Sequence, residues 1–167
     1  MKAAYFTEHG GPEVLTYGDV PDPVAGPGEI VIDVHAASVN AADCKVRSGE
    51  SGIKSALPYV LGRDFSGVIS AIGAGVDGFQ TGDPVFGVCD VGQEGAYAEK
   101  VAMDASLVAP KSATLSHVEA AALAATGLTA LITIEDTLHL KAGETILIQG
   151  GAGGVAGLAI QVAKHHG

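Results

Sequence analysis

The chain has 167 residues, of which 47% are hydrophobic, so it is long enough for one domain and part of a second and apolar enough to bury a core. Its formal net charge of −10 argues against a nucleic-acid footprint, which needs a clustered basic face, and against docking on an anionic membrane surface. The two cysteines, Cys44 and Cys89, are too few for a disulfide scaffold or a four-cysteine zinc site.

The first five residues, MKAAY, carry no apolar stretch of the kind that an export signal contains. The longest uncharged apolar run, Ala120–Ile134, is shorter than the roughly 20 residues that span a bilayer. We therefore expect a cytoplasmic protein that has no membrane partner.

Up to about Pro110 the sequence is typical of β structure. Short runs rich in β-branched residues are separated by Gly and Pro, which favour turns. The expected strands are Glu29–Ala36, Val68–Ile72, Pro84–Cys89, Ala96–Met103 and Leu107–Ala109. Short strands with such turns predict a partly closed barrel rather than a parallel sheet.

After Pro110 the pattern becomes that of alternating helices and a strand. Ser116 and Glu119 have the spacing of a capping box, and a helix is expected to follow towards Ile134. An apolar strand, buried on both faces, is predicted at Glu144–Gln149, and a second helix at Leu158–Lys164. The chain is thus expected to be α/β overall, with a β domain over residues 1–115 and the beginning of a doubly wound domain over 116–167.

A glycine-rich turn joins that strand to that helix. Gly151, Ala152, Gly153, Gly154, Val155 and Ala156 fit the pattern G-x-G-x-x-G/A. In this context the backbone N–H groups and the positive end of the helix dipole can bind a pyrophosphate. The alternative is a tight turn with no ligand. The acidic or basic residue that would distinguish NADH from NADPH is expected about 20 residues further on, beyond Gly167.

The order of several segments resembles the medium-chain dehydrogenase/reductase superfamily, in its zinc-free, quinone-oxidoreductase-like branch. The matching segments are residues 1–3, 38–43, 46–49, 62–68, 82–87, 127–130 and 150–156. The resemblance implies a GroES-like β-barrel on the substrate side followed by a Rossmann domain, of which this chain would hold only the first part.

The same resemblance implies that the chain has no catalytic zinc. Asn40 stands where zinc-dependent members have a cysteine, and Gly62-Arg63-Asp64 stands where they have Gly-His-Glu. Arginine is a permanent cation with no lone pair to offer a metal. Without a Lewis acid to deprotonate an alcohol, hydride transfer to an acceptor that is already electrophilic is the easier reaction.

Asn40 and two residues that follow it, Asp43 and Lys45, are the candidate catalytic groups. Asn40 could donate from its amide to an acceptor oxygen or the nicotinamide, or it could stabilise a turn. Asp43 and Lys45 lie on the short segment after it, which the resemblance places at the cleft, and Lys45 is either an oxyanion donor or a solvated lysine. The resemblance places Thr126 and Thr129 beside the nicotinamide; the alternative is that their hydroxyls bond back to their own helix turn.

We therefore expect an oxidoreductase that uses NADPH, or NADH, to reduce a quinone or an α,β-unsaturated carbonyl without metal. A reductase of enoyl thioesters is one alternative, and a nucleotide-binding module without turnover is another. The 167-residue chain is expected to be inactive or impaired by itself. The resemblance leaves a homodimer open.

Overall fold

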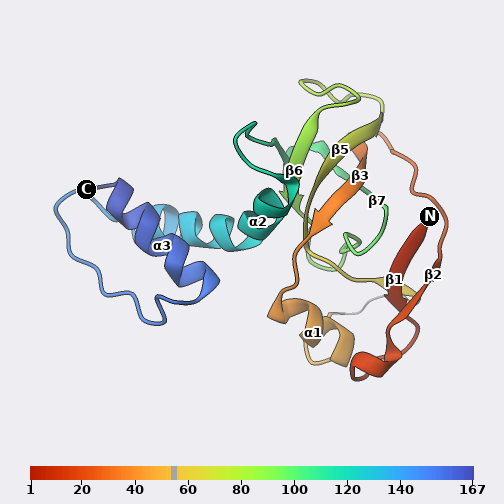
Figure 1. The fold of residues 1–167 in the computed structure, drawn as a ribbon, viewed down its shortest axis with the longest axis horizontal. Coiled ribbons are helices and arrows are strands. Elements are labelled where there is room, and N and C mark those ends of the chain that lie inside the picture. Colours follow the sequence, from red (N-terminus) through yellow and green to blue (C-terminus); the bar gives the residue numbers. More distant parts are fainter. Residues whose placement is uncertain (54–55) are drawn as a thin grey trace. The chain divides into compact units, whose positions relative to one another are not determined.

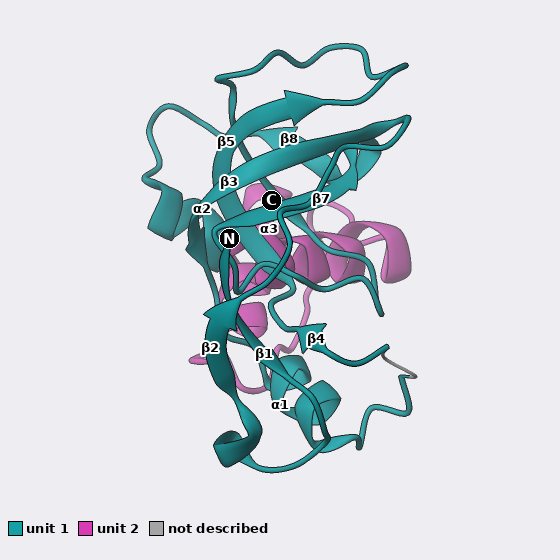
Figure 2. Ribbon diagram, turned by 90° about the vertical axis from the view of Figure 1, so that its right-hand side faces the viewer, with its two compact units in different colours: residues 1–122 teal, residues 123–167 magenta. Residues whose placement is uncertain are grey.

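The computed structural model describes residues 1–53 and 56–167, which fall into two compact units, Met1–Ala122 and Leu123–Gly167 (Figure 2). The division lies within helix α2 (His117–Leu131). This division reflects which residues contact one another. The side chain of His117, the first residue of α2, is hydrogen-bonded to Ser66 in the first unit. The domain boundary between residues 115 and 116 therefore stays a prediction.

The first unit is built from antiparallel strands (Figure 1). Within the described residues, β1 (Lys2–Phe6), β2 (Thr16–Asp19) and β4 (Tyr59–Val60) form one sheet in the order β2-β1-β4. A five-stranded sheet has the order β7-β3-β5-β6-β8, from β3 (Glu29–Ala37), β5 (Asp64–Ile72), β6 (Pro84–Val88), β7 (Lys100–Asp104) and β8 (Val108–Pro110). This is the antiparallel barrel architecture that the Gly- and Pro-separated strands predict.

Apolar side chains of the larger sheet form the main core of this unit. Ile30 and Ile32 on β3, Phe65 and Ile69 on β5 and Val85 on β6 are at most 1% exposed. Burying side chains of this size contributes about 1.5–3 kcal/mol each. The core therefore fixes β5, the strand whose first residue, Asp64, belongs to the candidate site.

Two parts of the first unit differ from the sequence expectation. The strand expected from Ala96 begins only at Lys100, because residues 97–99 bond instead to β1 and to the segment before β5: Ala4 N–H donates to Tyr97 O and Tyr97 N–H donates to Leu61 O, both at 2.8 Å. The helix α1 (Ala41–Ser48) was not predicted, since only its capping residues mark it in the sequence.

The second unit is helical. Helix α2 continues into a π-helical turn, Ile132–Thr137, and α3 (Gly154–His165) packs on that turn. The expected capping box at the start of α2 is confirmed, since Ser116 N–H donates to Glu119 Oε2 at 2.8 Å and Glu119 N–H donates to Ser116 Oγ at 3.2 Å.

The strand predicted at Glu144–Gln149 is wrong for this structure. No strand is assigned there within the described chain, because a parallel strand needs neighbours to pair with. The segment is buried on one face only: Ile146 and Ile148 pack on the cluster around Ala130, Ile134 and Ala159, whereas Leu147 is 86% exposed.

Among the described residues, one helical stretch, His117–Thr137, is long and apolar enough by composition to cross a membrane. It passes beyond the run expected from the sequence because the helix continues through charged residues of the π-helical turn. A single stretch of this kind is weak evidence, since core helices share these properties.

Candidate functional site

Asn40 forms the N-terminal cap of α1. Its backbone is extended, and its N–H donates to Asp43 Oδ2 at 2.7 Å as part of a capping box. A carboxylate in the first turn also lies at the positive end of the helix dipole. Local sequence therefore determines where α1 begins and brings two of the predicted catalytic residues into direct contact.

The amide group of Asn40 is oriented by Asp64. Asn40 Nδ2 lies 2.9 Å from Asp64 Oδ1 and 3.3 Å from Ser38 Oγ, and Ser38 Oγ donates to the same carboxylate oxygen at 2.7 Å. An ionised carboxylate only accepts hydrogen bonds, so Asn40 must face it with its NH₂ group. The Asn40 amide thus donates within the chain, to Asp64 and Ser38, and its donation to a substrate oxygen stays a prediction.

Asp43 is buried, with 3% of its surface exposed. Its Oδ2 accepts from Asn40 N–H and from the hydroxyl of Tyr97, the latter at 2.9 Å. Its Oδ1 is also buried and has no hydrogen-bond partner within the described part of the chain. Asp43 therefore holds the segment together instead of facing solvent, whereas Lys45, two residues on, is exposed.

Tyr97 completes this group of residues, and sequence reasoning missed it. Its hydroxyl donates to Asp43 Oδ2 and lies 3.2 Å from the carbonyl oxygen of Ser38. Burial, and then the neighbouring Asp43 carboxylate, raise the pKa of the Tyr97 phenol above its usual range. No local motif marks Tyr97, because its partner is 54 positions away in the sequence.

The predicted phosphate-binding turn lies in the second unit. Helix α3 begins at Gly154 with Gly153 as its cap, and its first intrahelical bond runs from Gly157 N–H to Gly153 O at 2.8 Å. The first N–H groups of a helix have no partner inside it. The backbone of Gly153 is extended, with no side-chain hydrogen bond at the cap, so the donors that this cap offers are main-chain N–H groups.

Glycines around this entrance leave little room for a side chain. A Cβ atom at Gly151 would lie 2.9 Å from Cδ1 of Ile160, and a Cβ atom at Gly157 would lie 3.3 Å from the carbonyl oxygen of Gly151. Helix and turn thus approach each other closely at Gly157, one position after the last residue of the G-x-G-x-x-G/A pattern.

The two threonines predicted beside the nicotinamide differ in their surroundings. Thr129 Oγ1 donates to Ala125 O at 2.7 Å, which is the bond back to its own helix turn. The Cγ2 atom of Thr126 lies 3.2 Å from where a Cβ atom of Gly154 would be. The structure therefore brings Thr126 to the start of α3, while the cofactor role of both residues stays a prediction.

Comparison with known proteins decides the family. The model of the alcohol dehydrogenase GroES-like domain matches residues 26–113. Rat quinone oxidoreductase is 38% identical over 168 residues, which cover 100% of this chain and 50% of the relative. The chain belongs to the medium-chain dehydrogenase/reductase superfamily. It spans about half the length of the curated relatives it matches.

Two other known proteins are also similar over nearly the whole chain. The 2-methylene-furan-3-one reductase of tomato is 38% identical, with 99% of this chain and 44% of that protein covered. A mycobacterial protein solved in complex with NADPH is 37% identical with a TM-score of 0.90, and the match covers 100% of this chain and 51% of that one. The resemblance to the quinone-oxidoreductase-like branch is thereby confirmed.

The positions that zinc-dependent members use for ligands carry other chemistry here. Asn40 is bonded to Asp64, and Arg63 Nη2 donates to the carbonyl oxygen of Cys89 at 3.2 Å. Nowhere in residues 1–53 and 56–167 do three His, Cys, Asp or Glu side chains gather as a metal site would require.

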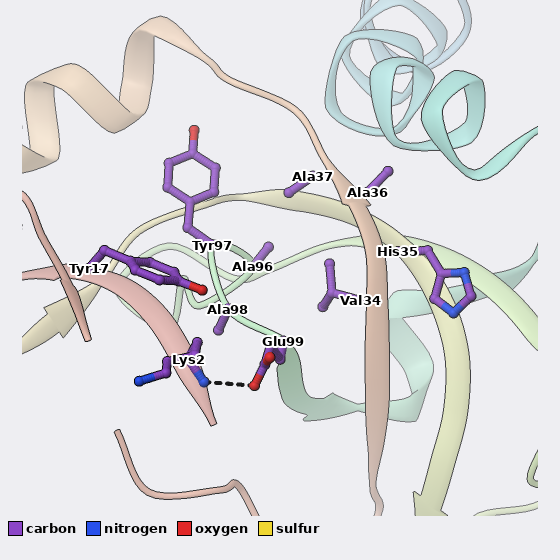
Figure 3. A pocket seen from close by; sticks show the side chains of 10 residues that line it. All are labelled: Lys2, Tyr17, Val34, His35, Ala36, Ala37, Ala96, Tyr97, Ala98 and Glu99. Carbon is purple, nitrogen blue, oxygen red and sulfur yellow. Dashed lines mark hydrogen bonds between the residues drawn. The ribbon is translucent and has the colours of Figure 1, made fainter. Parts of the chain in front are cut away.

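A hollow of about 310 Å³ lies in the GroES-like part of this dehydrogenase-family chain (Figure 3). It is lined by Lys2, Tyr17, Val34, His35, Ala36, Ala37, Ala96, Tyr97, Ala98 and Glu99. The predicted catalytic residues are absent from this lining. Tyr97 links the two places, since its ring borders the hollow and its hydroxyl reaches Asp43.

Proposed function

We propose that the protein containing this chain is an NADPH-dependent oxidoreductase that delivers hydride to a quinone or an α,β-unsaturated carbonyl without zinc. The names of the rat and tomato relatives support both acceptor classes, and the mycobacterial complex supports NADPH as the cofactor, with NADH as the alternative. In this proposal residues 1–115 carry the acceptor side and residues 116–167 begin the nucleotide-binding domain.

The observation that carries the proposal is the glycine-lined entrance of α3. The residues there fit a dinucleotide, because the N–H groups of Gly154, Val155 and Ala156 precede the first intrahelical bond and can bind a diphosphate. Gly151, Ala152 and Gly153 leave the approach open. When bound, the reduced nicotinamide supplies the hydride, and the chain orients it through these backbone donors.

The zinc-free part of the proposal rests on side-chain chemistry. Arg63 cannot ligate a metal, and the amide of Asn40 is held by Asp64. An acceptor that is already electrophilic needs only hydrogen-bond donors for the oxygen on which negative charge develops. We assign Lys45 to that role because its ammonium group is exposed, with Asn40 and Asp43 holding the segment in place.

The enoyl-thioester and binding-module alternatives predict different outcomes in one assay. Full-length protein is mixed with NADPH and 9,10-phenanthrenequinone or an enone, and the absorbance of the reduced cofactor is followed. Consumption supports the proposal; consumption only with enoyl thioesters would favour the first alternative. Binding of NADPH with no turnover across the panel would favour the second. Stoichiometric zinc in the purified protein would contradict the metal-free mechanism.

The glycine entrance is tested by the substitution Gly153→Val. The backbone at Gly153 has φ −80° and ψ 160°, which any residue adopts, and a Cβ atom there would lie 3.3 Å from Gly150 O, so the variant should fold after a small shift of the turn, which circular dichroism checks. Its branched side chain would occupy the diphosphate approach and should weaken NADPH binding by at least about tenfold, as measured by fluorescence titration. Lys164→Ala, at the exposed far end of the same helix, is the control, and unchanged binding by Gly153→Val would mean that the turn holds no cofactor.

A further inference from the structure

The backbone around Tyr97 is fixed on two sides. Its N–H donates to Leu61 O and its carbonyl oxygen accepts from Ala4 N–H, both at 2.8 Å. Two residues later, Glu99 O accepts from Val34 N–H at 2.8 Å. Tyr97 therefore lies on a segment that is hydrogen-bonded to both β1 and β3, and the position of its backbone is fixed.

The hydroxyl of Tyr97 is a permanent hydrogen-bond donor. The phenol is partly buried beside two carboxylates, Asp43 and Asp64, and both factors raise its pKa. It therefore stays protonated throughout the working pH range. In Figure 3 its hydroxyl points away from Lys2 and Glu99, and its proton is shared between Asp43 Oδ2 and Ser38 O.

Asp43 transmits this contact to Asn40. One carboxylate oxygen accepts from both Tyr97 and the backbone N–H of Asn40, while the other is buried without a partner in the described residues. Removing the Tyr97 hydroxyl would leave the buried Asp43 carboxyl group with one described hydrogen-bond donor, the backbone N–H of Asn40. A buried carboxyl group that loses a hydrogen-bond donor becomes unfavourable, so Asp43 would be expected to move, and the backbone of Asn40, which donates to it, would move as well.

We propose that Tyr97 is a positioning residue for the reaction. It acts through Asp43 to hold Asn40 and the start of α1 in place. The role rests on the proposed function, since it concerns the segment assigned to the acceptor side. Tyr97 itself need not touch the substrate. Displacement of a positioned group by about an ångström costs up to 10²-fold in rate, and we expect an effect of about tenfold in kcat from this hydroxyl.

The test compares Tyr97→Phe with Tyr17→Phe in the full-length protein. Both remove a hydroxyl from a tyrosine that lines the same hollow, but Tyr17 is 75% exposed. Tyr97→Phe should lower kcat about tenfold while the KM for NADPH stays within twofold of wild type, and Tyr17→Phe should change neither. In an Asp43→Ala background Tyr97→Phe should have no further effect, because the path through Asp43 is already lost.

A second readout does not depend on turnover. The side-chain NH₂ signals of Asn40 in an NMR spectrum should shift in Tyr97→Phe and remain in place in Tyr17→Phe. Unshifted Asn40 signals, an unchanged kcat, or a full effect in the Asp43→Ala background would overturn the positioning role while leaving the proposed function intact. If wild-type protein consumes no NADPH with any quinone or enone, the proposed function fails and the positioning role fails with it.

Discussion

The contact between Gly62 and Tyr97 gives a sharp stability prediction. Gly62 has φ +102°, and a Cβ atom there would lie 2.5 Å from Cδ1 of Tyr97 and 2.6 Å from its backbone nitrogen. That nitrogen is held by its bond to Leu61 O, so Tyr97 cannot simply move away. We therefore expect Gly62→Ala to strain the backbone and to overpack the site at the same time.

The magnitude follows from two contributions. A positive φ costs a residue with a side chain roughly 1–2 kcal/mol, and overpacking typically costs about 1–3 kcal/mol. The free energy of unfolding should thus fall by roughly 2–5 kcal/mol, which lowers Tm by roughly 5–20 °C for a domain of this size. Thermal and urea unfolding followed by circular dichroism measure this change.

The control is Gly95→Ala. Gly95 N–H donates to Gly62 O at 3.1 Å, so the two glycines occupy the same crossing of the chain. A Cβ atom at Gly95 would make only an ordinary contact, 3.5 Å from Cγ2 of Val101, and its stability should stay within about 1 kcal/mol of wild type. Equal Tm values for the two variants would show that the described approach of Gly62 to Tyr97 is incorrect.

Two further predictions concern titratable groups. Burial, and then the charges of His35 and Lys111, lower the pKa of His117 below 6.5. The folded protein therefore binds a proton at His117 less readily than the unfolded chain does. The contribution of His117 to the free energy of unfolding is thus complete above about pH 6.5 and decreases as the pH drops below it. The urea midpoint should show this decline in wild type and less of it in His117→Asn. Burial raises the pKa of the Cys89 thiol to about 12, whereas Cys44 is exposed. An alkylating reagent at mildly alkaline pH should therefore modify Cys44 in the native protein and reach Cys89 only after urea is added. Rapid labelling of Cys89 in the native protein would contradict its burial.

Local patterns predicted what local physics determines. The capping box at Ser116 and Glu119 forms as its spacing predicts, because both partners lie within one helical turn. The β-branched run at Glu29–Ala36 became β3 for the same kind of reason, since its alternation suits a pleated strand.

Features that depend on distant partners could not be predicted from the sequence. The segment Glu144–Gln149 has strand composition but forms no strand in the described chain, because pairing requires neighbouring strands. Tyr97 reaches Asp43 across 54 positions, and no spacing rule foresees such a contact. The sequence therefore named the segment of the candidate site, whose role stays a prediction, while its hydrogen-bond partners needed coordinates.

The hydrogen bonds described for Ser38, Asn40 and Asp43 all come from residues within Met1–Ala122. In the described residues, the hydrogen bonds of the segment that the proposal assigns to the acceptor side are therefore made within the amino-terminal unit, without the glycine-rich turn proposed to bind the nucleotide. Exchanging this unit between related enzymes should carry acceptor preference with it and leave coenzyme preference behind. Evolution can then vary the two properties independently, through substitutions in separate stretches of the gene.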